Sequence, residues 1–404
     1  MSQSSSQNIT ELPPEDAAAI FKRSQTLLLA VAALALAFFP VMFRYFPQQW
    51  GREYYQFFPF AIGVTLGFAI VRCDARPRFA GGNFRWILRG VVFAAALAVL
   101  AIAAIRSASP LTYYVAMTLI LALILDFFIE RDSGRSLTYL IIPFLLTVRP
   151  PGDRDVRVIQ KLQTITSSIA SQFLNTLNLD HILEGNRIIP MQGSELLVAE
   201  ACSGVQSLFT LMFIASVIGV YHRYPILRIA FLTGSAVFWA LIMNVMRVMT
   251  IAVGQMKFNV DLTSGWQHDV VGYSAMLLSI PFLLSTDRLL SFFFGPIPDD
   301  PRKHQKINVM VLAWNWLLSS SAELLETPAE VAERIRRLPD WSGLKAGRRL
   351  ILCGLALLAV LAALPGWRLL VPNPAPQAPP AAQADLNPQN TTQLAEANAI
   401  GVPQ

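Results

Sequence analysis

The chain has 404 residues, of which 54% are hydrophobic and only 14% are charged. Soluble domains carry about 25% charged residues, so this composition fits poorly with a free globular enzyme. The formal net charge of +6 raises the question of a nucleic-acid partner, but the 32 Lys and Arg residues follow a membrane topology instead. Three cysteines are too few for a disulfide scaffold or a thiolate-rich metal site.

Apolar runs long enough to cross a bilayer recur along the chain. A helix rises about 1.5 Å per residue, so crossing the hydrocarbon core takes about 18 apolar residues or more. Such runs lie near residues 26–43, 55–71, 87–105, 111–129, 203–220, 229–253, 269–287 and 350–366. A ninth run, 137–148, is short and contains Pro143, which fits a tilted, broken or re-entrant span. The sequence predicts an all-α polytopic membrane protein with eight or nine transmembrane helices.

The distribution of Lys and Arg orients these spans. With nine spans and a cytoplasmic N-terminus, the predicted cytoplasmic segments hold 21 Lys and Arg residues and the outer segments hold 10. Cytoplasmic loops are enriched in Lys and Arg, so the asymmetry favours this orientation. Without a span at 137–148, the basic segment 288–349 falls on the outer side. We therefore favour nine spans in the cytoplasmic membrane, with the N-terminus inside.

The segment 149–201 is predicted to lie outside the cytoplasm. Its first part carries an apolar stripe typical of an amphipathic helix on the membrane surface. The stripe consists of Val156, Ile159, Leu162, Ile165, Ile169, Phe173 and Leu177. Two short runs, Arg187 to Pro190 and Glu195 to Ala199, flank residues 191–194. This pattern predicts a β-hairpin that leads into the next span.

Arg247 is a cation inside an otherwise apolar run, Phe238 to Ala252. Such a charge is costly unless it is paired or faces a polar cavity, and intramembrane charges are functional by default. Asn244 precedes it by three residues and so shares its helix face. The alternative is a structural cation that is satisfied by carbonyl groups or reaches the nearby outer boundary.

Cys202 stands at the predicted outer boundary, where the helix near 203–220 begins. The helix dipole and the unpaired amides there favour thiolate over thiol. The same amides can stabilise an oxyanion. The alternative is an inert small hydrophobe, as most buried cysteines are. Cys353, inside the last run, and Cys73, in an inner loop, fit that alternative.

Two of the four histidines, His181 and His268, fall on the predicted outer side. His268 stands at the outer start of the next span, so its ring can approach Cys202 and Arg247. His181 lies beside Asp180 and is the rival. A thiol, a guanidinium and an imidazole from three consecutive long spans are thus predicted to meet at one membrane depth, a set that a transport protein does not need.

This set of residues resembles the exosortase and archaeosortase family of multi-span cysteine transpeptidases. The matching motifs are Ala201-Cys-Ser-Gly204 with Ser207-Leu208, Asn244-Val-Met-Arg247-Val, and His268 followed four residues later by Gly272. The resemblance covers roughly residues 115–290, and the segment beyond 290 lies outside it.

The resemblance implies an activity and its partners. The substrates would be secreted proteins with C-terminal sorting signals of the PEP-CTERM kind: a short motif such as Pro-Glu-Pro, a hydrophobic span and a basic tip. They would be cleaved outside the cytoplasmic membrane and passed to a cell-surface or exopolysaccharide-linked acceptor. Besides these signals, the expected partners are the lipid bilayer and proteins of exopolysaccharide biosynthesis, with no nucleic acid, metal or cofactor.

Three residues receive roles under this reading. Cys202 would form a thioester with the substrate. Arg247 would stabilise the oxyanion or hold the substrate carbonyl, and His268 would move the proton. The candidates for supporting or substrate-binding contacts are Glu200, Ser203, Gly204, Asn244 and Asp269, and Glu200 is equally well explained as a solvated charge at the interface.

Two other functions stay open at this point: a polytopic transporter, and a membrane scaffold of exopolysaccharide assembly with a vestigial site. A transporter favours inverted repeats and several ionisable residues at mid-membrane. The chain has one strong intramembrane cation, near one end of its span. Transpeptidation and hydrolysis share the same acyl-enzyme, so the sequence does not separate them.

The predicted organisation follows from these assignments. The segments are a cytoplasmic N-terminal segment at 1–25, N-terminal transmembrane helices at 26–148, an outer helix and hairpin at 149–201, a catalytic transmembrane core at 202–287, a cytoplasmic helical segment at 288–349, a last transmembrane helix at 350–366 and a disordered outer tail at 367–404. Within the cytoplasmic segment, Thr327-Pro-Ala-Glu330 predicts a helix start. The polar residues before the first run, with no cleavage site after it, argue against a removable signal peptide.

Overall fold

The computed structural model describes residues 17–74, 83–105, 109–152, 154–191, 196–197, 204–295, 297, 309–318 and 333. The helices are α1 (Ala17–Ala37), α2 (Phe39–Trp50), η1 (Glu53–Tyr55), α3 (Phe58–Arg72), α4 (Asn83–Ile105), α5 (Pro110–Asp126), η2 (Leu137–Leu140), α6 (Ile141–Leu145), α7 (Arg154–Thr176), α9 (Gly204–Tyr221), α10 (Ile226–Phe258), α11 (Gly265–Phe293) and α12 (Val309–Leu317). The strands are β1 (His181–Glu184), β2 (Arg187–Pro190) and β3 (Leu196–Leu197). These residues are mostly helical, as predicted.

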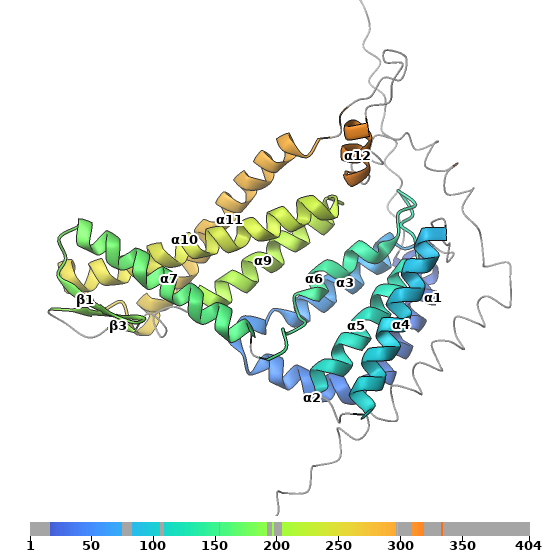
Figure 1. Ribbon diagram of the computed structural model, residues 1–404, viewed down its shortest axis with the longest axis horizontal. Helices are drawn as coiled ribbons and strands as arrows, with labels where there is room; N and C mark the ends of the chain where they lie inside the picture. The colour runs from blue at the N-terminus through green and yellow to red at the C-terminus, as the bar shows by residue number, and fades with distance from the viewer. Residues whose placement is uncertain are drawn as a thin grey trace, which may run out of the picture.

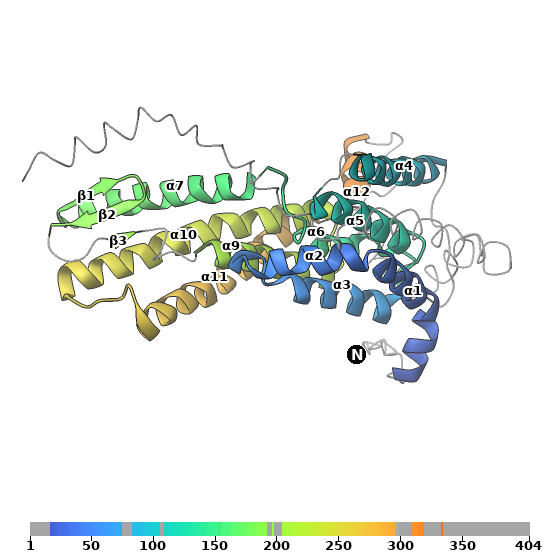
Figure 2. The same ribbon diagram turned by 90° about the horizontal axis from the view of Figure 1, so that it is seen from below.

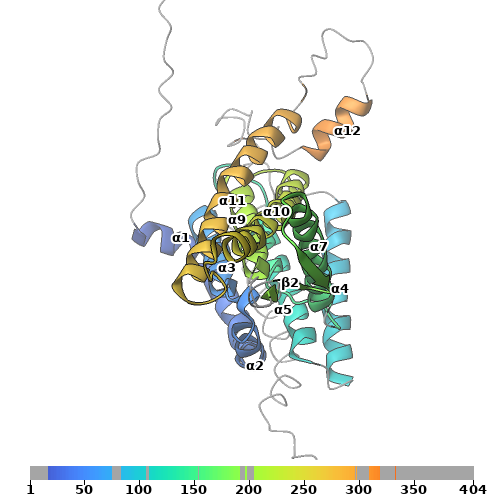
Figure 3. The ribbon, with the colours of Figure 1, turned by 90° about the vertical axis from the view of Figure 1, so that its left-hand side faces the viewer.

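The helices form two neighbouring groups (Figure 1). Helices α1 to α6 gather on one side, while α9, α10 and α11 pack against one another and extend toward α7 and the strands. Viewed from the end that carries the strands, α7 and α9 to α11 stand in front of the first group (Figure 3). The groups meet where α9 contacts η1 and α6.

Five helical segments are long and apolar enough to cross a membrane: Ala18–Ala37, Glu53–Arg72, Trp86–Ala103, Ile226–Phe258 and Gly265–Phe293. Two shorter apolar helices, Pro110–Asp126 and Val205–Tyr221, join them within the described residues. Each falls on a predicted run, and the fold is that of a multi-pass membrane protein. The total of eight or nine spans stays a prediction.

The first predicted run is divided into two helices. α1 ends at Ala37 and α2 begins at Phe39, so the prediction of one helix over 26–43 is wrong. Pro40 lies in the first turn of α2. A proline is tolerated there because its missing amide hydrogen has no partner to lose, but it cannot continue the hydrogen bonding of the preceding helix.

The short run at 137–148 forms η2 and α6, and it leads from the end of α5 to α2. At its start, Ser136 Oγ donates to the carboxylate of Asp126 at the end of α5, with an O–O distance of 2.8 Å. At its end, Tyr45 Oη of α2 donates to the Thr147 carbonyl at 3.1 Å. Broken backbone at membrane depth is stable only where protein groups satisfy it. Tyr45 satisfies the Thr147 carbonyl in this way, and Thr65 Oγ1 of α3 donates to the Leu140 carbonyl at 3.2 Å.

A buried ionic cluster joins the two groups at the end predicted to be cytoplasmic. The Glu130 side chain has no exposed surface, and its Oε1 lies 2.6 Å from Arg223 Nε and 3.7 Å from Arg72 Nε. Arg72 also donates to the Val220 carbonyl at 2.9 Å. Removing one partner of a buried ion pair typically costs about 3–5 kcal/mol. The cluster therefore fixes the end of α9 against α3.

α7 runs beside the second half of α10 (Figure 2). Ala170 and Leu174 share a buried cluster with Val248 of α10. The predicted apolar stripe is only partly this packed face, because Phe173 and Leu177 are exposed. The predicted helix is present with a packing partner that the stripe did not indicate. Its position on the membrane surface stays a prediction.

The sheet has three antiparallel strands in the order β1-β2-β3. The predicted hairpin is present, with Arg187 opposite Leu197. β1 is an addition to the predicted elements and pairs with β2, placing His181 opposite Pro190. The sequence signal for the β1–β2 hairpin is the dipeptide Gly185-Asn186, because such a pair between two short strands is typical of a tight turn. In the structure, Gly185 takes φ +59° at this turn.

Several predictions concern residues outside the described ranges. These are most of the N-terminal segment, the helix start at 327–330, the last run at 350–366 and the tail at 367–404. Of the predicted cytoplasmic helical segment, the structure describes chiefly α12 and the end of α11.

Candidate active site

Two antiparallel helices bring Arg247 and His268 together. Arg228, near the start of α10, pairs with Asp287 of α11 at an Nη2–Oδ1 distance of 2.7 Å. Arg247 follows Arg228 by 19 residues, and His268 precedes Asp287 by 19 residues. At about 1.5 Å per residue, about 28 Å of each helix separates this ion pair from the site. The equal spacing sets the register that makes Arg247 and His268 neighbours.

Arg247 is only 4% exposed, and its guanidinium donates to the imidazole of His268 with an Nη2–Nε2 distance of 2.8 Å. A guanidinium has donors and no acceptor, so Nε2 must be the unprotonated ring nitrogen. The other ring nitrogen, Nδ1, lies 3.2 Å from the Leu262 carbonyl, and only a protonated Nδ1 can donate to it. The geometry therefore fits a neutral imidazole with its proton on Nδ1.

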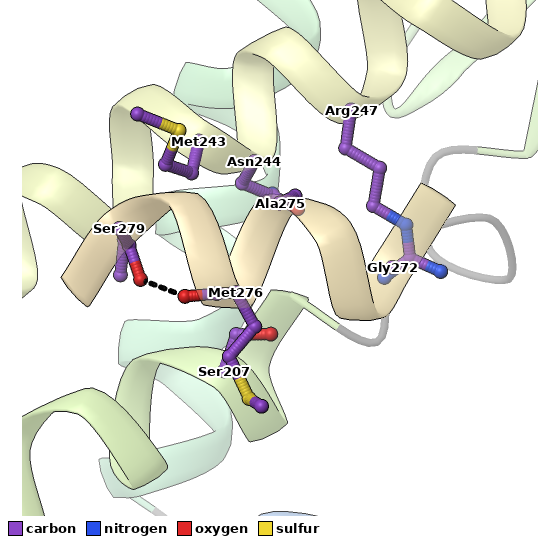
Figure 4. Close-up of a pocket in the computed structure, with 9 residues that line it drawn as sticks. Ser207, Met243, Asn244, Arg247, Gly272, Ala275, Met276 and Ser279 are labelled. Atoms are coloured by element: carbon purple, nitrogen blue, oxygen red, sulfur yellow. Dashed lines mark hydrogen bonds between the residues drawn. The ribbon is translucent and has the colours of Figure 1, made fainter. Parts of the chain in front are cut away.

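A small pocket lies beside this pair, between α9, α10 and α11 (Figure 4). Gly272 of α11 faces the guanidinium so closely that a Cβ there would lie 3.0 Å from Cζ and Nη2 of Arg247. Ser207 of α9 and Asn244 of α10 line the same pocket. Three helices thus supply polar groups to one small space, and the absence of a side chain at 272 makes room for the cation.

Asn244 connects the pocket with α7. Its Nδ2 donates to Thr166 Oγ1 at 3.3 Å. Its Oδ1 is buried and accepts no hydrogen bond from the residues that the structure describes. A buried amide oxygen normally has a donor, so Asn244 can accept one from a bound molecule.

The structure places only some of the predicted site residues. Glu200, Cys202 and Ser203 lie outside the described residues. Gly204 is the first residue of α9, one residue from the predicted start of this span. Asp269 follows His268 on α11 and is exposed, in contrast to the buried Arg247.

The rival histidine is held elsewhere. His181 Nε2 lies 2.7 Å from Ser171 Oγ of α7, and its Nδ1 lies 2.8 Å from the Leu179 carbonyl. Both ring nitrogens are therefore engaged within α7 and the loop before β1. The structure brings His268 to Arg247, and not His181.

Thr166 and Leu262 contact the site but are absent from the predicted residues. Leu262 acts through its backbone carbonyl, which no side-chain motif reveals. Thr166 lies on the packed face of α7, and only the contact between α7 and α10 gives it a partner in the site. Neither residue carries a signal that sequence spacing alone could have found.

A family model described as Transmembrane exosortase (Exosortase_EpsH) matches residues 50–285, more than half of the chain. The chain belongs to the transmembrane exosortase family. The exosortase match includes α9 and α10, Arg247, His268 and Gly272. It begins well before residue 115, where the motif resemblance starts, and so extends the resemblance to α3. No curated protein and no solved structure matches this exosortase.

Proposed function

We propose that this exosortase is a membrane cysteine transpeptidase. It would cleave C-terminal sorting signals of the PEP-CTERM kind from secreted proteins and transfer the proteins to a cell-surface or exopolysaccharide-linked acceptor. The observation that carries the proposal is the hydrogen bond between Arg247 and His268 beside the start of α9. A fixed cation and an imidazole in one pocket suit acyl transfer, and Cys202 precedes α9 by two residues. Family membership supports the substrate class.

The proposal puts the site at the outer face of the cytoplasmic membrane, with the N-terminus inside. The excess of Lys and Arg in the loops at the Arg228 end supports this orientation. The helix length between the Arg228–Asp287 pair and Arg247 is about 28 Å, close to the hydrocarbon thickness of about 30 Å. A substrate anchored by its own hydrophobic span would present the scissile bond at the same boundary.

In the first chemical step, His268 takes the thiol proton and the sulfur of Cys202 attacks the carbonyl carbon of the scissile peptide bond. The new C–S bond leaves a negative charge on the carbonyl oxygen. Breakage of the C–N bond gives the thioester, and the leaving amine takes the proton from His268. The acceptor then attacks the thioester, passes its proton through His268, and releases the Cys202 thiol. Water in place of the acceptor gives hydrolysis.

The bond between Arg247 and His268 links proton transfer to oxyanion stabilisation. Nε2 of His268 has one lone pair, so it takes the thiol proton as the hydrogen bond from Arg247 breaks, and the two positive groups then repel each other. The guanidinium donors then become available when the oxyanion forms. Glu200, Ser203, Gly204, Asn244 and Asp269 complete the proposal as supporting or substrate-binding contacts.

Thiol labelling in intact cells tests both the orientation and the nucleophile. In a chain with Cys353 replaced by Ser, we expect a membrane-impermeant maleimide to modify Cys202 and to leave Cys73 unmodified. Cys73 has no exposed surface, and burial raises the pKa of its thiol to about 12, so it is both shielded and protonated.

The matched control for this labelling is Cys202→Ala in the same background, which should remove the signal. A substrate-tail peptide should slow the labelling of the parent chain by occupying the site. Modification of Cys73 from outside would contradict the orientation, and a Cys202 that stays unreactive even in opened membranes would contradict an accessible nucleophile.

Gly272→Ala should lower substrate processing by up to about tenfold. The added Cβ would sit 3.0 Å from the Arg247 guanidinium, which must then shift by a few tenths of an ångström. A displacement of about 1 Å in a catalytic geometry can cost about 100-fold, so a smaller shift costs less. The rate of tail removal, normalised to the amount of enzyme in the membrane, measures the effect.

Gly234→Ala in α10 is the control, because a Cβ at 234 meets no atom within 4 Å. It changes a helical glycine in the same way and should leave processing unaltered. Equal rates for Gly272→Ala and the parent chain would show that the Arg247 position has no part in the reaction.

A further inference from the structure

The loop between α10 and α11 has only six residues, 259–264, and its start is fixed by backbone hydrogen bonding. Asn259 ends α10 in the left-handed conformation with φ +53°, which asparagine tolerates better than most residues. The next amide, that of Val260, donates to the Gly254 carbonyl at 2.9 Å. The chain therefore leaves α10 in a defined direction.

A side-chain turn closes the second half of this loop. The Oδ1 of Asp261 accepts from the amide of Thr263 at 2.8 Å and from its hydroxyl at 2.5 Å. Aspartate side chains that accept from the amide two residues on form a compact turn of this kind. The hydrogen bonds from Thr263 lower the pKa of Asp261, so the acceptor is a carboxylate at neutral pH.

Between these two fixed points, Leu262 is anchored on α10. A Cβ at position 254 would lie 2.8 Å from Leu262 Cδ1, so the side chain of Leu262 occupies the space that Gly254 leaves. Leu262 also packs against the buried cluster that includes Val248 of α10 and Leu174 of α7. Its carbonyl is therefore held at one place, 3.2 Å from His268 Nδ1.

We propose that Gly254, Asp261 and Leu262 are positioning residues that orient His268 for catalysis. They hold the Leu262 carbonyl, and the carbonyl keeps the proton of the neutral ring on Nδ1. Nε2 therefore keeps the lone pair that accepts from Arg247 at rest and takes the thiol proton in the reaction. A hydrogen bond at one imidazole nitrogen sets the chemistry of the other. This inference rests on the proposed function, in which Nε2 of His268 receives the thiol proton.

The first experiment compares Asp261→Ala with Asp261→Asn in the full chain. The alanine variant loses the turn acceptor, whereas asparagine keeps an oxygen at the same place. We expect Asp261→Ala to lower the kcat of tail removal about tenfold with KM within about twofold, and Asp261→Asn to restore kcat. Asp180→Ala, at an exposed acid outside this loop, is the control and should match the parent chain.

A double-mutant cycle tests the packing contact between the Leu262 side chain and Gly254. Gly254→Ala alone should lower kcat because the new Cβ displaces Leu262. In a Leu262→Ala background the side chain that clashes is gone, so the same glycine change should have little further effect. Losses that simply multiply in the double variant would overturn the proposed contact.

The rate of Cys202 alkylation as a function of pH separates this inference from the proposed function. If His268 takes the thiol proton, His268→Asn shifts the alkylation profile, and Asp261→Ala should shift it in the same direction by a smaller amount. No shift with His268→Asn would overturn the proposed function itself. A shift with His268→Asn together with parent-like kcat and profile for Asp261→Ala would overturn only the positioning role.

Discussion

Cys202→Ala is expected to abolish removal of the C-terminal signal from a tagged substrate, while the variant chain still accumulates in the membrane. In the proposed reaction the sulfur forms the covalent bond to the substrate, and the alanine side chain has no nucleophilic atom to take its place. Loss of a nucleophile that works with a base typically lowers the rate by about 10⁴-fold or more. The time course of substrate shortening measures the effect.

Cys202→Ser should be as inactive as the alanine variant, because a hydroxyl ionises far less readily than a thiol. Cys73→Ala is the matched control: it removes a buried thiol at the other end of the helices and should leave processing intact. Processing at the parent rate by both Cys202 variants would contradict a covalent role for this thiol and would favour a transport or scaffolding function.

Arg247→Gln should lower kcat by about 100- to 1,000-fold, the usual cost of losing one preorganised oxyanion donor. The substitution removes the positive charge and the donor that lies 2.8 Å from His268 Nε2. Tail removal at saturating substrate measures the loss. The variant should bind a substrate-tail peptide nearly as well as the parent chain, because the lost interaction is strongest in the transition state.

Arg247→Lys separates charge from geometry. Lysine keeps a cation but lacks the planar fork that lets one guanidinium contact both an imidazole and an oxyanion. We expect an intermediate rate, above that of Arg247→Gln and well below that of the parent chain. Parent-like rates for both variants would reduce Arg247 to a structural cation, the alternative that its sequence left open.

Much of the helical fold follows from the sequence because hydrocarbon thickness dictates the length of an apolar run. The pairing of Arg247 with His268 could also be anticipated. Both lie near the ends of their runs, so the predicted topology places them at one depth, and the structure joins them by a hydrogen bond. The predicted topology does not decide whether His181 or His268 lies beside Arg247, because both histidines are on the predicted outer side.

The hydrophobic pattern of a sequence does not predict features that depend on packing between helices. The division of α1 from α2 near Phe38 involves a single proline, Pro40, inside an apolar run. The contact of α7 with α10 combines Ala170 and Leu174 with the polar Thr166, and none of these three residues belongs to the predicted apolar stripe. The Leu262 side chain packs where Gly254 has no side chain, and its backbone carbonyl contacts His268. A hydrophobic pattern records neither feature.

The central claim, a thioester between Cys202 and the cleaved protein, is tested most directly by the mass of the new C-terminus formed in the presence of hydroxylamine. This small nucleophile competes with the natural acceptor for a thioester. The account predicts a shortened substrate that ends in a hydroxamate with the parent chain, and unprocessed substrate with Cys202→Ala. A shortened substrate that forms equally with the Cys202→Ala chain would contradict it.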